Sequence, residues 1–451
     1  MGQIAYAEEW KRTGPDLVVY LPDSENGHDS ANQHLLVVKA PGGAWLAFWT
    51  MGADEGQPNQ SVVVARSTDR GRTWTAPAIV DGRATEMDPN FRAPINRDRV
   101  WRAAALSDEA AKDHAGMASW GFPVVVPEMG RVYCFYWKCT GVADFRYDIS
   151  GALLCRYSDD DGVTWSDDRY EIPLQRTCGD NPDQAIPVSW IIWQTPLRTD
   201  LDEIIAPFTC WNSAHSPAGP GSESYFMRFD NILTERDPAL LTTTTFPESA
   251  RGLRVPSAID PKESFCEEPA LVELSDGRFY CVMRTDAGFL SFSMSNDRSR
   301  TWSPPAPVYR DHGGPLMLHP VTPAPLYRMR DGRFLLLYCN NNGDANGGHF
   351  PCRFECWREN RWPAFASIGR EDEAHPARGL RFGPPKVLIN TDGAPIGVAG
   401  RRDAGSYPSL LEDDNERILF YPDRKHFLLG KFLTDEWLAD CDPDLATQQS
   451  S

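Results

Sequence analysis

The sequence predicts an all-β protein, a six-bladed β-propeller closed by a strand from the N-terminal region. Two observations predict this fold: a turn motif that occurs three times, and a weaker hairpin pattern that divides the chain into six units. The composition, with 35 glycines and 37 prolines among 451 residues, is typical of short strands joined by many turns. We therefore expect one closed domain over residues 1–451, although the length alone would suggest two or three.

The repeated motif reads S-x-D-x-G-x-T-W and occurs at 67–74, 158–165 and 295–302, with Ser299 in place of the glycine in the third copy. The aspartate can accept hydrogen bonds from the turn's own backbone, and the glycine supplies a conformation that is costly for other residues. The tryptophan packs against neighbouring residues and so fixes the strand that follows the turn. Because each copy follows an apolar strand, the three turns indicate a repeat architecture.

The weaker pattern is an apolar strand, a turn of the type D-G-R, and a second apolar or aromatic strand. It predicts six blades at 34–79, 119–172, 185–246, 265–308, 319–389 and 405–433. The sixth is one strand short, and residues 16–20 can supply that strand, which would close the ring and remove exposed sheet edges. A short helix is expected in the insertion at 100–114.

Charge and hydropathy exclude several kinds of partner. The net charge of −18 argues against nucleic acid and against an anionic membrane. No apolar run approaches the length of a transmembrane helix, and the first residues have neither a basic flank nor an apolar core. We therefore expect a cytoplasmic protein, with a trimmed secreted form as the alternative.

The eleven cysteines fall mostly in strand-like apolar runs, which favours buried reduced thiols. Cys352 and Cys356 are four residues apart, but no second pair lies nearby. The remaining candidate metal ligands near the mouth of the ring are His319, His349, Asp180 and Asp183. Their spacing in the sequence does not require an ion. We expect no metal and no cofactor.

Candidate site residues follow from the register of the blades. The first strand of each blade lines the axis of a propeller, so matching positions converge on one mouth. Counting nine residues back from the turn position of Gly277 reaches Glu268. The same offset in each unit selects His34, Gly121, Trp193, Glu268, Pro323 and Tyr407. A histidine, a glutamate and a tyrosine at one mouth suggest a catalytic site; the alternative is that each packs singly in the core.

A phenol beside a carboxylate can pass its proton across and attack an electrophilic carbon. A tyrosine nucleophile suits a substrate that carries its own carboxylate, because a less charged nucleophile meets less repulsion. Such a substrate needs guanidinium groups, and Arg284 and Arg353 are the candidates. Trp193 either stacks on a sugar face or fills the channel.

Two segments resemble the sialidase superfamily, whose members are six-bladed propellers with repeats called Asp boxes. The segment 267–285 (E-E-P-A-L-V-E-L-S-D-G-R-F-Y-C-V-M-R-T) is similar to the one that carries the glutamate partner and an arginine, which implies those roles for Glu268 and Arg284. The segment 406–412 (S-Y-P-S-L-L-E) is similar to the one with the tyrosine nucleophile, which implies Tyr407. Arg353 matches a further arginine, and the Asp boxes extend the resemblance over nearly the whole chain.

The sequence departs from that pattern in the first blade. His34 stands where sialidases have an arginine, and the stretch 57–61 (Q-P-N-Q-S) has no carboxylate where the family has its acid/base aspartate. A histidine here resembles the propeller rhamnosidases and rhamnose–glucuronate lyases of the same broad group, which implies that His34 is a base or an acid.

Three functions remain open from the sequence. The first is an exo-acting glycoside hydrolase that releases a terminal sugar at or next to a carboxylate from an oligo- or polysaccharide. Tyr407, Glu268 and His34 would carry out the proton transfers and the nucleophilic attack, while the arginines bind the substrate carboxylate. The second is a lyase acting on a uronic acid, in which His34 or Tyr407 removes the proton beside the carboxylate. The third is a sugar-binding propeller without catalysis.

Overall fold

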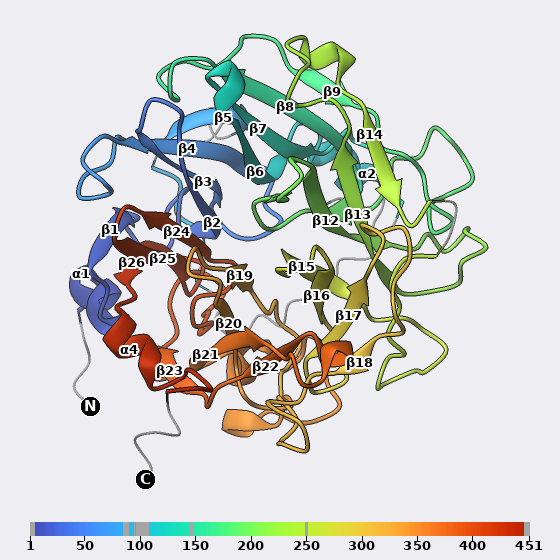
Figure 1. The fold of residues 1–451 in the computed structure, drawn as a ribbon. Coiled ribbons are helices and arrows are strands. Elements are labelled where there is room, and N and C mark those ends of the chain that lie inside the picture. The colour runs from blue at the N-terminus through green and yellow to red at the C-terminus, as the bar shows by residue number, and fades with distance from the viewer. Residues whose placement is uncertain are drawn as a thin grey trace.

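The computed structural model describes residues 5–83, 90–93, 95, 108–144, 146, 148–248 and 251–445. Six small antiparallel sheets are arranged in a ring around a central axis (Figure 1). The six-bladed β-propeller predicted from the repeats is therefore confirmed. The helix expected at 100–114 falls in part outside the described residues; within them, α2 spans Asp108–Asp113.

The first three blades follow one another along the chain. Blade one contains β2 (Ala31–Lys39), β3 (Trp45–Gly52), β4 (Ser61–Ser67) and β5 (Ala78–Gly82). Blade two contains β6 (Ala118–Val126), β7 (Arg131–Lys138), β8 (Ala152–Ser158) and β9 (Tyr170–Ile172). Blade three contains β10 (Trp190–Ile191), β11 (Leu197–Arg198), β12 (Ile204–Trp211), β13 (Ser222–Phe229) and β14 (Thr243–Phe246). Both β10 and β11 pair with β12, so the inner strand of this blade is interrupted.

Blades four and five repeat the arrangement. Blade four contains β15 (Glu267–Glu273), β16 (Phe279–Arg284), β17 (Ser291–Ser295) and β18 (Ala306–Pro307). Blade five contains β19 (Leu326–Arg328), β20 (Phe334–Tyr338), β21 (Ala364–Glu371), β22 (Leu380–Phe382) and β23 (Lys386–Ile389).

Blade six joins both ends of the chain. It contains β24 (Ser409–Asp413), β25 (Glu416–Asp423) and β26 (Phe427–Phe432), and its outer strand is β1 (Leu17–Tyr20). Leu17 pairs with Gly430, and Figure 1 shows blue β1 beside red β26. The closure by residues 16–20 that the sequence predicts is thus confirmed, and β1 covers the edge that β26 would otherwise expose.

The helices are short. The α-helices are α1 (Tyr6–Glu9), α2, α3 (Trp357–Asn360) and α4 (Asp435–Ala439). The 3₁₀ turns are η1 (Trp10–Thr13), η3 (Pro127–Met129), η4 (Pro238–Leu240), η5 (Ala345–Gly347) and η6 (Pro376–Arg378). Within the described part of the chain, none of the helices combines the length and the apolar character needed to span a bilayer.

The three Asp boxes form the turns that their residues predict. In the first, Asp69 accepts hydrogen bonds from the backbone N–H of Thr73 at 2.9 Å and from its hydroxyl at 2.6 Å, while Gly71 donates to the Ser67 hydroxyl at 2.8 Å. The bonds from Thr73 are the largest reason that the pKa of Asp69 falls to about 2. The same bonds recur around Asp160 and Asp297.

The tryptophan of each Asp box packs against a phenylalanine of the preceding blade. The pairs are Trp74 with Phe420, Trp165 with Phe48, and Trp302 with Phe226, at centroid distances of 6.1, 5.7 and 4.2 Å. The motif therefore does more than fix a hairpin: it joins neighbouring blades.

The largest hydrophobic cluster draws residues from all six blades and includes the ring of Tyr407. All eleven cysteines lie in the described residues and are free thiols, and ten of them are buried, as the sequence predicts.

Candidate active site

Irregular inner strands bring side chains to the axis. Four residues at matching places have positive φ: His34 (38°), Trp120 (55°), Glu268 (44°) and Tyr407 (62°). In blades one, two and four this residue lies where the pairing of the inner strand shifts register, which is the geometry of a β-bulge. Such a backbone conformation costs about 1–3 kcal/mol per residue and is typically found at functional sites.

The bulged backbone is stabilised by the preceding blade. The N–H of Trp120 donates to the hydroxyl of Thr50 at 2.9 Å, and the N–H of Glu268 donates to the hydroxyl of Thr209 at 2.6 Å. These bonds satisfy N–H groups that the strand ladder leaves free.

Tyr407, Glu268 and Arg284 are in contact, and all three are buried. The Tyr407 hydroxyl donates to Oε1 of Glu268 at 2.7 Å, and Nη1 of Arg284 lies 2.6 Å from the same oxygen. Burial and the charge of Glu268 raise the pKa of Tyr407 well above 10, so its phenol is protonated at neutral pH. Any reaction of this phenol as a nucleophile therefore requires proton transfer, and Glu268 is in place to accept it.

Arg284 and Glu268 each keep an atom that could form a further hydrogen bond. Nε of Arg284 and Oε2 of Glu268 are buried without a hydrogen-bond partner in the part of the chain that the structure describes. The neighbouring carboxylate of Glu267 is 3.6 Å from Nε of Arg284, too far for a hydrogen bond. Because an unsatisfied buried polar group costs about 1–3 kcal/mol, these atoms are suited to a polar ligand.

A pocket of about 280 Å³ opens at this place. Its wall includes Tyr407, Glu268 and Arg284, together with the aromatic rings of Trp120 and Trp211. The cationic side chains of the wall are Arg146, Arg284, Arg353, Arg361, Arg401 and Lys425, and the carboxylates are Glu55, Asp148, Glu263, Glu267 and Glu268. This concentration of arginine stands out in a chain with a net charge of −18.

His34 lies beside the site but outside the pocket wall. Its ring is fully buried, and Nε2 donates to the carbonyl of Gly121 at 2.8 Å. Trp120 lies next to both rings, with centroids 5.4 Å from His34 and 5.4 Å from Tyr407. Burial lowers the pKa of His34 to about 4, so the ring is neutral at pH 7. This position gives no geometric support to the predicted role of His34 as acid or base.

Of two further positions from the nine-residue offset, Gly121 differs from expectation, and Trp193 fits one of its two predicted alternatives. In blade two the residue at the bulge is Trp120 and not Gly121, because the 3₁₀ turn η3 adds one residue between the bulge and Gly130. Trp193 is fully buried and packs edge-on against the Tyr407 ring at 5.8 Å. It is absent from the pocket wall, so its position supports channel filling rather than stacking on a sugar.

Arg353 lies in the pocket wall, as predicted, and its guanidinium is held by hydrogen bonds to other side chains. Its guanidinium contacts Glu263 at 2.6 Å, the hydroxyl of Ser257 at 2.9 Å and Asp286 at 3.2 Å. These partners fix the orientation of the side chain.

Several pocket residues were missed from the sequence because loops supply them. Arg361 follows α3, Arg401 precedes β24, and Lys425 lies in the turn between β25 and β26. Arg361 donates to the carbonyl of Val321 at 3.1 Å and to Asp403 at 3.3 Å. The basic runs Arg401-Arg402 and Arg424-Lys425-His426 were the available signal.

Glu55, in the loop between β3 and β4, was also missed. It lies two residues before the stretch 57–61, which has no carboxylate, and its side chain pairs with Lys425 at 3.1 Å and with Arg401. Burial alone would raise the pKa of Glu55, but the two cations hold it far below its ordinary value. Burial lowers the pKa of Lys425 to about 8, and Lys425 Nζ lies 5.0 Å from the ring centre of Tyr407.

Solved structures with the same fold include several sialidases and a protein of unknown function. The intramolecular trans-sialidase from Ruminococcus gnavus is 15% identical, with a TM-score of 0.58 over 94% of this chain and 98% of that one. The protein of unknown function from Dyadobacter fermentans is 15% identical, with a TM-score of 0.56 over 93% and 96%. The Hadza microbial sialidase Hz136 is 14% identical, with a TM-score of 0.56 over 91% of this chain, which spans 66% of that one.

At these identities the structural likeness shows the fold alone. No curated protein matches the sequence. A family model does: the BNR repeat-like domain matches residues 43–415, which include all three Asp boxes. The chain therefore belongs to the BNR repeat-like domain family, and its fold is the one found in solved sialidases.

Proposed function

We propose that this protein cleaves the glycosidic bond of a terminal sugar that bears a carboxylate, as an exo-acting glycoside hydrolase. The observation that carries the proposal is the contact of Tyr407, Glu268 and Arg284 at the wall of a pocket rich in arginine. Tyr407 is the nucleophile. Glu268 takes the phenol proton as the oxygen attacks the anomeric carbon, so no free phenolate is needed.

The substrate carboxylate is held by arginine. Arg284 has a buried Nε without a partner, and Nη2 of Arg361 makes no hydrogen bond to any residue that the structure describes. Arg353 contributes a third guanidinium whose orientation its acidic partners fix. A planar guanidinium binds a carboxylate through two parallel hydrogen bonds, which favours acidic over neutral sugars.

Departure of the leaving group requires a proton donor. Glu55 and Asp148 are the carboxyl groups that blades one and two contribute to the pocket wall. Asp148 pairs with Arg146, and Glu55 pairs with two cations. The substrate would have to weaken one of these pairs before the carboxyl group takes up a proton.

One observation favours a second candidate, elimination at a uronic acid. The cations beside Glu55 lower its pKa, which makes it a poor proton donor for hydrolysis. Elimination instead needs a base for the proton beside the carboxylate and positive charge to stabilise the resulting anion. Lys425, whose pKa burial lowers to about 8, lies next to Tyr407 in the pocket and can serve as the base. Tyr407 can serve as the base only after its phenol proton has passed to Glu268.

The test uses aryl glycosides of sialic, glucuronic and galacturonic acid, neutral glycosides of the same size, and a uronic-acid oligosaccharide. Hydrolysis adds one water to the products, whereas elimination leaves an unsaturated sugar that absorbs in the ultraviolet. We expect cleavage of at least one acidic substrate and none of the neutral ones. Equal cleavage of neutral and acidic glycosides would contradict the proposal. Binding of acidic glycans without any turnover would favour a sugar-binding propeller.

A further inference from the structure

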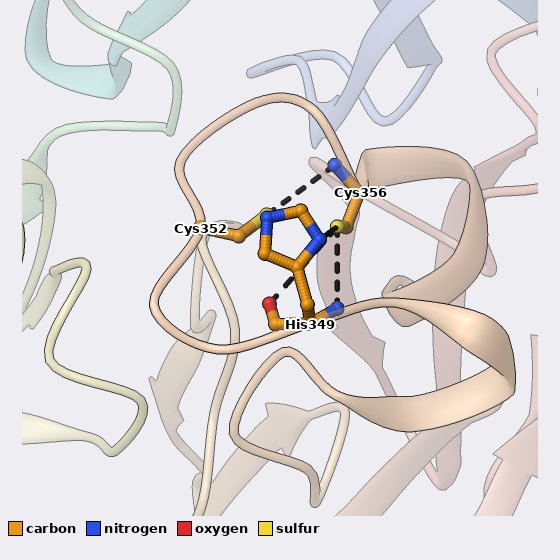
Figure 2. Close-up of side chains that lie close together, drawn as sticks. All are labelled: His349, Cys352 and Cys356. Carbon is orange, nitrogen blue, oxygen red and sulfur yellow. Dashed lines mark hydrogen bonds between the residues drawn. The ribbon is translucent and has the colours of Figure 1, made fainter.

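The loop between β20 and β21 contains a cluster of three metal-binding side chains. His349, Cys352 and Cys356 lie together with all their ligand atoms within 4.8 Å of one another (Figure 2). Nδ1 of His349 is 3.0 Å from Sγ of Cys356. These residues follow the pattern H-x₂-C-x₃-C. In the sequence Cys352 and Cys356 have no second cysteine pair nearby, but in the structure His349 supplies a third donor.

The distances suit zinc. With Zn–S near 2.3 Å and Zn–N near 2.0 Å, two donors of a tetrahedral site lie about 3.6–3.8 Å apart. The 3.0 Å contact is about half an ångström shorter than this, because thiol and imidazole are hydrogen-bonded to each other directly. A small side-chain movement would therefore admit the ion.

The backbone around the cluster is arranged to support thiolates. The N–H of Cys356 donates to Sγ of Cys352 at 3.3 Å, and the N–H of His349 donates to Sγ of Cys356 at 3.4 Å. Such N–H···S bonds stabilise negative charge on sulfur and orient the ligands. Both cysteines are buried, whereas His349 is exposed, so an ion can enter from solvent on the histidine side.

We propose that His349, Cys352 and Cys356 form a Zn²⁺ site with a water molecule as the fourth ligand. No fourth His, Cys, Asp or Glu joins the cluster in the described part of the chain. Binding exchanges the two thiol protons for the ion, which is a proton release and involves no redox change. Thiolate and imidazole are the ligands that select zinc over magnesium or calcium.

The site would fix the wall of the pocket. Arg353 and Phe354 lie between the two cysteines, Trp357 follows directly after Cys356, and all three line the pocket. Phe354 also lies against the guanidinium of Arg284, at 5.2 Å from the ring centre. The segment between β20 and β21 has only η5 and α3 as regular structure. Zinc would tie the segment together beside the residues that contact the substrate, although none of its ligands lines the pocket.

The experiment measures metal and not activity, so its outcome is independent of the proposed catalysis. The full chain is purified without chelator, and its zinc content is determined by mass spectrometry of the metals. We expect one zinc per chain. Cys352→Ser and Cys356→Ser should each weaken zinc binding by more than about tenfold, since even a change of an outer-shell partner costs 10–100-fold. The matched control, Cys178→Ser, removes a thiol outside the cluster and should keep the zinc.

Titration of the wild-type apoprotein with Co²⁺ covers the case in which a cysteine variant fails to fold. We expect near-ultraviolet absorption from charge transfer between thiolate and Co²⁺, saturating at one equivalent and displaced by Zn²⁺. A wild-type chain that binds neither ion at micromolar concentration would overturn the proposal. Folded Cys352 and Cys356 variants that bind zinc as tightly as the Cys178 variant would also overturn it.

Discussion

The phenol of Tyr407 in blade six donates a 2.7 Å hydrogen bond to Oε1 of Glu268 in blade four, across 139 residues of sequence. Both residues have positive φ, and the irregular inner strands direct their side chains into the same pocket. The bond therefore depends on ring closure, and it links the fold to the proposed chemistry.

Removing the charge of Arg284 should destabilise the protein. Arg284→Met leaves the buried carboxylates of Glu267 and Glu268 without their cation, and breaking a buried pair in this way costs about 3–5 kcal/mol. Urea unfolding measures the change. The exposed Arg300→Met is the control and should shift the free energy of unfolding by less than about 0.5 kcal/mol. Equal stabilities of the two variants would show that Arg284 does not neutralise this pair.

Arg361→Lys should weaken substrate binding more than turnover. Lysine keeps a positive charge near Asp403 but loses the planar fork that we assign to the substrate carboxylate. We expect KM for an acidic substrate to rise about tenfold, which is about 1.4 kcal/mol, with kcat changed much less. Arg358→Lys, outside the pocket wall, is the matched control. A fall in kcat at constant KM would place Arg361 in the chemical step instead.

The third Asp box contains a strained serine. Ser299 has a φ of 69°, and its hydroxyl is buried without a partner in the described residues. Ser299→Gly should stabilise the protein by about 1 kcal/mol, because glycine adopts this conformation without steric cost. The reverse change, Gly162→Ser, should destabilise it by about 1–2 kcal/mol, since φ is 80° and a Cβ would lie 2.6 Å from Leu46. Unfolding curves in urea test both signs, and the same sign for both would contradict the explanation.

Stability should fall on mild acidification because of buried histidines. Burial lowers the pKa of His34 to about 4, of His319 to about 4 and of His426 to about 3. Below pH 6.5 the unfolded chain binds protons that the folded chain does not, so stability is complete above pH 6.5 and decreases as the pH falls towards 4. Each histidine accounts for up to about 3 kcal/mol of this change.

The contribution of His34 can be separated from that of the other histidines. His34→Asn should reduce the loss of stability between pH 6.5 and 4, whereas the exposed His215→Asn should leave it unchanged. Parallel profiles of both variants and the wild type would indicate that His34 does not titrate as its burial requires.

The ring of six blades and the pair Glu268 and Tyr407 could be predicted from the sequence for definite physical reasons. Asp boxes and D-G-R turns are local, because their hydrogen bonds and positive φ angles lie within a few residues. Blades of similar length keep a constant offset, so counting from Gly277 found Glu268, and the same count reached Tyr407.

Other features depend on interactions that such counting does not include. The extra residue in η3 moves the bulge of blade two from Gly121 to Trp120. Trp193 lies between β10 and β11, where the inner strand is interrupted, and its side chain is buried. Glu55 and Lys425 come from loops of different blades, and only the closed ring brings them together. The cluster at His349 has a local signal, which a search restricted to cysteine pairs does not detect.

Turnover by Tyr407→Phe tests whether Tyr407 is the nucleophile. The change removes one oxygen from the pocket wall, and the matched control Tyr327→Phe removes a phenol that binds the carbonyl of Pro408. With an acidic glycoside cleaved by the wild type, we predict that kcat falls at least about 10²-fold in Tyr407→Phe while Tyr327→Phe stays within about twofold of the wild type. Full activity of folded Tyr407→Phe would contradict a nucleophilic role for Tyr407.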